Sequence, residues 1–91
     1  MNKRNIKKIE KVFKGGANHY RIELLVLIDK NPDITLSSLV DIMDVAFKTL
    51  AQHLYKLYLY GLINKIYNNQ RVMHRLSDSG KKVVRFIKSW M

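Results

Sequence analysis

Hydrophobic residues in the first third of the chain recur at steps of three and four, the spacing that predicts amphipathic helices. The pattern indicates a lysine-rich helix over residues 3–14, ended by Gly15-Gly16. A second helix begins at an Asn18 cap and runs to about Lys30. Because the first helix has only a narrow apolar stripe, we expect it to pack on the rest of the domain or on a second subunit.

Two further helices follow in close succession. After a brief extended link at 34–35, Thr35 or Ser37 caps a third helix that ends at about Asp44. A tight turn leads to a fourth helix over 46–60, which Gly61 terminates. Its leucines form one apolar stripe, so the opposite side is predicted to face solvent. The residues predicted on or beside that outward face are Phe47, Lys48, Thr49, Ala51, Gln52, Tyr55 and Lys56.

The last third of the chain predicts a hairpin and a fifth helix. Apolar and polar residues alternate at 62–67 and 71–76 on either side of a turn sequence, which gives a hairpin with a basic, amide-rich tip. Ser77 or Asp78 caps a last helix that runs to about residue 90. The tip residues are Asn68, Asn69, Gln70 and Arg71. The order α-α-β-α-α-β-β-α, mainly α with a small hairpin, predicts a single winged helix-turn-helix domain over 1–91.

Charge is distributed unevenly along the chain. Lys and Arg outnumber Asp and Glu by 17 to 7, a net charge of +10. Residues 1–16 carry +5 and residues 48–91 carry +8, whereas residues 17–47 carry −3. A positive field of this size attracts nucleic acid or anionic lipid, and the C-terminal half is the expected nucleic-acid face.

Several classes of function find no support in the residue types. The absence of cysteine excludes disulfides, thiolate metal sites and a cysteine nucleophile. His19, His53 and His74 are too widely spaced for a helical or hairpin metal site, so we expect no metal and no other cofactor. His19 and His74 are expected on the surface or in the hairpin. No carboxylate pair, phosphate-binding glycine loop or nucleophile with a base occurs, so we do not expect an enzyme.

The chain also lacks the features of a membrane or secreted protein. Its longest hydrophobic run, around Leu24 to Ile28, is far shorter than the roughly 20 residues that a membrane-spanning helix requires. The basic N-terminus is followed neither by an apolar stretch nor by a small-residue cleavage site. We therefore expect a cytoplasmic protein.

Two segments of the sequence resemble known regulators. The run from Leu39 to Ile63 resembles the helix-turn-helix signature of ArsR-type regulators, in which a His-Leu pair is followed eight residues later by Gly and an aliphatic residue. Here these are His53-Leu54 and Gly61-Leu62-Ile63. The segment RLSDSGKKVV, from Arg75 to Val84, is similar to the junction before the last helix of MarR-type proteins. The resemblance implies a DNA-binding transcriptional regulator, and it implies that His53 supports the packing of the helix-turn-helix.

The sequence departs from the ArsR pattern in two ways. Ala46 occupies a position that is usually Ser, so the usual cap of the recognition helix is missing and Asp44 is the candidate substitute. The metal-sensing cysteines of many ArsR-type proteins have no counterpart here. The resemblance therefore carries over DNA binding but not metal sensing, and any effector is left undefined.

In such a regulator the fourth helix lies in the major groove of double-stranded DNA, and the hairpin, or wing, contacts the backbone or the minor groove. Lys48 can bind phosphate or guanine, and Gln52 can bind adenine edges. Thr49 or Phe47 can contact a thymine methyl. Arg71 can bind phosphates or a narrow minor groove.

The tyrosines of the fourth helix have less distinctive roles. Aromatic side chains on a helix more often cover the edge of a core than contact a ligand. We therefore expect Tyr58 and Tyr60 at the core edge and only Tyr55 pointing outward.

The terminal helices, 3–14 and 78–90, carry more apolar surface than one small core can bury. We therefore expect a two-fold homodimer built from them, which would place two recognition helices about one DNA turn apart on a pseudo-palindromic site. The residues assigned to its interface are Ile6, Ile9, Phe13, Phe86, Ile87 and Trp90.

Sequence-specific DNA binding by a dimeric transcriptional regulator is therefore the expected function. The first alternative is a winged-helix module that docks on a protein through the fourth helix or the hairpin. Non-specific, architectural DNA binding is the second. Attachment to an anionic membrane through the lysine-rich first helix is the third and least favoured.

Overall fold

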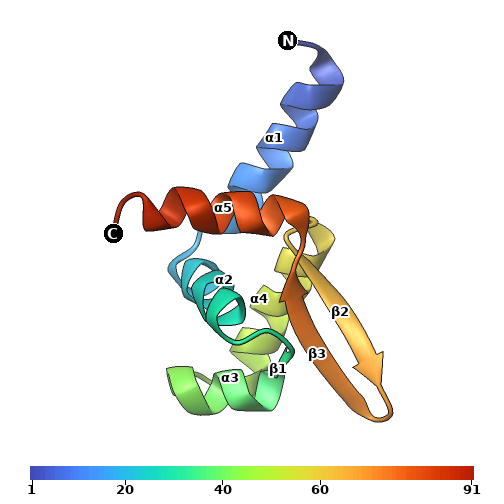
Figure 1. Cartoon of the computed structure of the whole chain (residues 1–91), viewed down its shortest axis with the longest axis vertical. Helices are drawn as coiled ribbons and strands as arrows, with labels where there is room; N and C mark the ends of the chain where they lie inside the picture. Colours follow the sequence, from blue (N-terminus) through green and yellow to red (C-terminus); the bar gives the residue numbers. More distant parts are fainter.

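A computed structural model describes all 91 residues, and its elements follow the predicted order (Figure 1). They are α1 (Lys3–Gly16), α2 (His19–Lys30), β1 (Ile34–Thr35), α3 (Leu36–Met43), α4 (Phe47–Leu59), β2 (Ile63–Asn68), β3 (Arg71–Leu76) and α5 (Asp78–Lys88). In Figure 1, α2, α3 and α4 lie together below α5, the β2–β3 hairpin extends to one side, and α1 projects away from the rest. The predicted fold class is confirmed. No helix combines the length and the apolar character needed to cross a membrane.

Three of the predicted helix caps form as the sequence indicates. The side-chain oxygen of Asn18 accepts from two backbone N–H groups at the start of α2. Thr35 caps α3, and Ser77 caps α5 by accepting from a backbone N–H in the first turn. Each cap satisfies a donor that has no partner inside the helix, which stabilises the helix by about 1 kcal/mol.

The prediction that Gly15-Gly16 ends the first helix is wrong, because both glycines lie inside α1 and Ala17 follows as its cap. Gly15 is buried where α1 meets the loop after α4. A Cβ atom at this position would lie 2.8 Å from Leu62 Cδ1 and 2.9 Å from the Cβ of Tyr60. Glycine therefore serves close packing here and does not terminate the helix.

Asp44 does not cap α4, which corrects a second prediction. Its backbone is left-handed, with φ 53°, and it ends α3 by donating its N–H to the Val40 carbonyl. Ala46 precedes α4 and offers no side-chain hydrogen bond. The first turn of α4 therefore keeps backbone N–H groups that have no side-chain cap.

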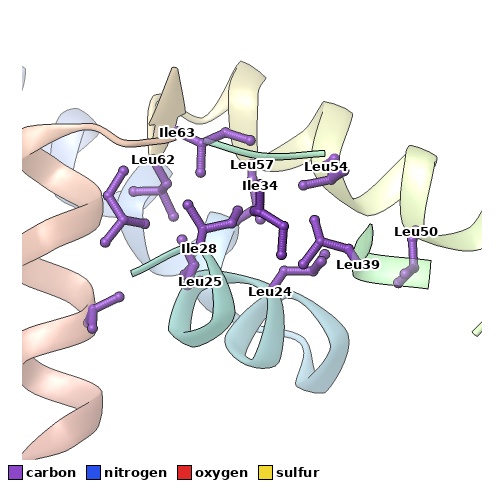
Figure 2. Packing of buried hydrophobic residues seen from close by; sticks show 12 residues of the cluster. Leu24, Leu25, Ile28, Ile34, Leu39, Leu50, Leu54, Leu57, Leu62 and Ile63 are labelled. Atoms are coloured by element: carbon purple, nitrogen blue, oxygen red, sulfur yellow. The ribbon is translucent and has the colours of Figure 1, made fainter. Parts of the chain in front are cut away.

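One hydrophobic core joins α2, α3, α4 and α5 to the sheet (Figure 2). Its buried members are Leu24, Leu25, Ile28, Ile34, Leu39, Leu50, Leu54, Leu57, Leu62, Ile63, Leu76 and Val84. From α1 only Gly15 is buried, although Val12 packs half-buried against the core. The apolar stripe of α1 is therefore left largely outside this core.

The sheet is antiparallel, in the order β1-β3-β2, and its central strand carries His74. β2 and β3 pair from Ile63 opposite Leu76 to Asn68 opposite Arg71, and Asn69 has φ 58° in the turn, as its sequence indicates. His74 lies in the hairpin, which is one of its two predicted places, and it is only 3% exposed. The short strand β1 covers it, and the Nδ1–H of His74 donates to the Ile34 carbonyl at 2.9 Å.

Candidate nucleic-acid interface

The packing of α4 determines which of its side chains face solvent. Leu50, Leu54 and Leu57 are buried against the core, and α3 packs beside α4. The opposite side carries the residues predicted to contact DNA. Phe47, Lys48, Gln52, Tyr55 and Lys56 are exposed, whereas Thr49 and Ala51 are half-buried at the edges of that face.

The hairpin tip presents the other predicted contacts to solvent. Asn68, Asn69, Gln70 and Arg71 are all exposed. Arg71 has no carboxylate within ion-pair distance, unlike Arg75, whose Nε and Nη2 donate to the two carboxylate oxygens of Asp33 at 2.5 and 3.0 Å.

This pair holds the pKa of Asp33 below its ordinary value, chiefly through the hydrogen bonds from Arg75. Arg75 is therefore engaged in the fold, and Arg71 is the arginine of β3 that is available to a ligand.

No acidic residue occurs from Val45 to Ser77, the stretch that contains α4 and the wing. Of the acids that precede it, Asp29 pairs with Lys88 at 2.7 Å and Asp33 pairs with Arg75, whereas Asp41 and Asp44, just before α4, are exposed and in no ion pair. The side chains that α4 and the wing themselves expose therefore include basic groups and no carboxylate. The uncapped first turn of α4 adds the partial positive charge of a helix N-terminus to the same surface.

Lys65, on β2, is a residue that the sequence reasoning missed. Its Nζ lies 5.0 Å from the centre of the Tyr58 ring and 5.8 Å from that of Tyr55. Tyr58 is 47% exposed, so its predicted place at the core edge is wrong. The available signal was the strand period, since Lys65 lies two residues after buried Ile63 and therefore on the same side of β2.

Arg21 of α2 is the second missed residue. It is 8% exposed, and its guanidinium joins the end of α1 to the middle of α4. Nε donates to the Gly15 carbonyl at 2.7 Å and Nη2 to the Lys14 carbonyl at 3.2 Å. Nη1 lies 3.1 Å from His53 Nδ1, and because a guanidinium can only donate, this histidine nitrogen accepts.

His53 packs inside the helix-turn-helix, as the resemblance implied. Its ring also lies beside that of Tyr20, with 5.3 Å between the centroids. Burial lowers the pKa of His53, and the positive charges of Arg21, Lys56 and His19 lower it further. The neutral imidazole that accepts from Arg21 is therefore favoured at neutral pH.

The terminal helices expose a third surface, away from the wing. Phe86 and Trp90 are 62% and 79% exposed and contact each other edge to face, with 6.3 Å between ring centroids. Ile6, Ile9 and Phe13 are also exposed, and Ile87 is half-buried. An apolar groove of about 340 Å³ runs between α1, α2 and α5. Its lining residues are Val12, Phe13, Gly16, Ala17, Ile22, Lys82, Val83, Phe86 and Ile87.

No three His, Cys, Asp or Glu side chains lie close enough together to hold a metal ion.

Comparison with solved structures places the fold. HlyU from Vibrio cholerae N16961 superposes with a TM-score of 0.87 at 24% identity, covering 98% of this chain and 97% of that one. The homodimeric winged helix-turn-helix DNA-binding domain of Mb0332 from Mycobacterium bovis, a possible ArsR-family regulator, gives 0.85 at 16%, covering 99% and 86%. An ArsR-like transcriptional regulator from Rhodococcus sp. RHA1 gives 0.75 at 21%, covering 94% and 85%. By sequence, no protein-family model and no curated protein matches the chain.

The chain is a winged helix-turn-helix protein, with α3 and α4 as the helix-turn-helix and β2–β3 as the wing. Its fold is that of the ArsR-like regulators, which is the fold that the resemblance in the sequence implied.

Proposed function

We propose that this protein binds double-stranded DNA in a sequence-specific manner and acts as a dimeric transcriptional regulator. The observation that supports this most directly is the exposed, acid-free surface that extends from α4 to the wing. Such a surface attracts the phosphate backbone over its whole length. The similar structures include a transcriptional repressor and an ArsR-like transcriptional regulator, and these support the same function.

In this function the N-terminal half of α4 enters the major groove. Lys48 binds phosphate or guanine, and Gln52 binds adenine edges. Thr49 and Phe47 contact thymine methyl groups, and the small side chain of Ala51 allows close approach of the helix to the bases. Toward the end of the helix, Tyr55 and Lys56 contact the backbone.

The wing and the terminal helices complete the proposed assembly. Arg71 and the amides of the wing tip contact phosphates or the minor groove beside the site of α4. Two copies associate through α1 and α5, burying the exposed side chains Phe13, Phe86 and Trp90. A two-fold axis through this surface spaces the two α4 helices for successive major grooves, roughly 34 Å apart.

Selection of bound sequences from random duplex DNA tests this function. We expect an enriched inverted repeat with half-sites about one helical turn apart. The double variant Lys48→Ala, Gln52→Ala should then lose about 1–3 kcal/mol of affinity per base contact removed. The matched variant Lys3→Ala, Asn5→Ala, which removes a lysine and an amide at the start of α1, should bind nearly as well as the unmodified protein. Enrichment without a motif would leave only non-specific binding.

A second candidate is docking on a protein partner through α4. The observation that favours it is the exposure of the apolar side chains Phe47 and Leu59 at the two ends of this helix. In that case the Lys48→Ala, Gln52→Ala variant keeps its DNA affinity, whereas Phe47→Ala abolishes capture of the partner. The DNA titration of the double variant therefore separates the two candidates.

A further inference from the structure

We propose that Lys65 is a DNA-phosphate-binding residue at the junction of the wing and the recognition helix, held in place by Tyr55 and Tyr58. This role depends on the DNA-binding function proposed above and adds a contact that neither the α4 face nor the wing tip contains.

The position of Lys65 follows from the sheet register. Lys65 pairs with His74 and lies two residues beyond Ile63, so its side chain leaves β2 on the side that faces the body of the domain. Lys65 is half-buried and lines a small pocket with Ala51 and Leu54 of α4. The wing and the recognition helix are therefore in contact through this lysine.

The two tyrosines hold the ammonium without neutralising it. At 5.0 and 5.8 Å from the ring centres of Tyr58 and Tyr55, Nζ lies within cation–π distance of both. None of the ion pairs in this domain involves Lys65, so no carboxylate lies within ion-pair distance of its Nζ. An ion pair would cancel the charge of Lys65, whereas an aromatic pair leaves it available for an anion.

A DNA phosphate is the anion that fits this place. With α4 in the major groove and the wing tip on the neighbouring backbone, the strand between them passes the base of the wing. Lysine binds phosphate as a compact charge with three donors. Because the side chain of Lys65 projects from the inner side of the wing, its predicted partner is the DNA backbone and not a base edge.

The salt dependence of DNA binding tests the role of Lys65. Lys65→Gln should reduce the slope of log K against log salt by about 0.9 for each protomer on the DNA, since one phosphate contact is lost. We expect affinity at 0.1 M salt to fall roughly three- to tenfold on both the selected site and random duplex, with an unchanged specificity ratio. Lys3→Gln removes the same charge at the far end of α1, and Lys65→Arg keeps the charge; both should retain the slope.

An unchanged slope for Lys65→Gln, in a protein that binds DNA, would overturn the role of Lys65 while leaving the proposed function intact. A protein that binds no duplex would overturn both. Selective loss of affinity on the selected site alone would also overturn it, because that outcome indicates a base contact.

The contact of Lys65 with Tyr55 and Tyr58 is tested by NMR in the DNA-free protein. The Lys65 Hε protons should resonate upfield of those of the other lysines, because they lie against aromatic rings, and Tyr58→Leu should remove most of that shift. The same variant should bind DNA about two- to threefold more weakly with its salt slope retained, because the charge remains but is no longer held. Lys65 Hε protons at the position of the other lysines would show that the tyrosines do not hold the side chain.

Discussion

Replacing Arg21 by methionine should destabilise the protein more than replacing any exposed basic residue. The substitution keeps a long, flexible side chain but removes three hydrogen bonds, two of them to the carbonyls that end α1. A hydrogen bond to a charged donor stabilises by about 1.5–3 kcal/mol, and the carbonyl of buried Gly15 is left without this donor. Burial of the guanidinium has its own desolvation cost, so the expected net loss is about 2–4 kcal/mol.

Thermal and urea unfolding at fixed protein concentration measure this loss. For a domain of this size each kcal/mol lowers Tm by about 4–8 °C, so Arg21→Met should melt roughly 8–32 °C lower. The control is Arg4→Met, at an exposed position of α1, which should change stability by less than about 0.5 kcal/mol. If Arg21→Met and Arg4→Met have the same Tm and the same urea midpoint, the guanidinium of Arg21 does not hold α1 to α4.

Three further predictions concern packing, assembly and pH. Gly15→Ala should destabilise by about 1–3 kcal/mol in urea unfolding, whereas Gly16→Ala, whose Cβ would meet only Val83 at 3.8 Å, should be neutral or stabilising. Phe86→Glu should convert the proposed dimer to a folded monomer in analytical ultracentrifugation, and a dimer that persists would place the interface elsewhere. Burial lowers the pKa values of His53 and His74 from 6.5, so the unfolded chain takes up protons first as pH falls. The free energy of unfolding should therefore keep the full contribution of these two histidines above about pH 6.5 and decrease below that pH. Urea midpoints that do not change from pH 7.5 to 5.5 would contradict this.

The order of elements was predictable because each one carries its own local signal. The caps Asn18, Thr35 and Ser77 and the turn at Asn69 all form where the sequence places them. Local signals fail where a distant contact decides the outcome. Gly15 has the local signal of a helix end, but its close approach to Leu62, 47 positions away in the sequence, determines its role.

The candidate interface was predictable in outline for the same reason, since helical periodicity alone turns Lys48 and Gln52 outward. Its supporting residues were not. Arg21 stands three residues before buried Leu24, on the inward side of α2, and Lys65 stands two residues after buried Ile63 on β2. In a hydrophobic pattern such a residue only interrupts the series of apolar positions, because the partners of its charge lie on other elements.

Arg21 and Lys65 both lie where two elements of the fold contact each other. Arg21 connects α1, part of the proposed dimer surface, to α4, and Lys65 connects α4 to the wing. A basic residue on an inward face costs desolvation that an apolar residue would avoid, so its presence requires partners that repay it. For Arg21 these partners are two carbonyls and an imidazole inside the protein. For Lys65 they are two aromatic rings that leave the charge available, which is why only the second residue is proposed as a contact to DNA.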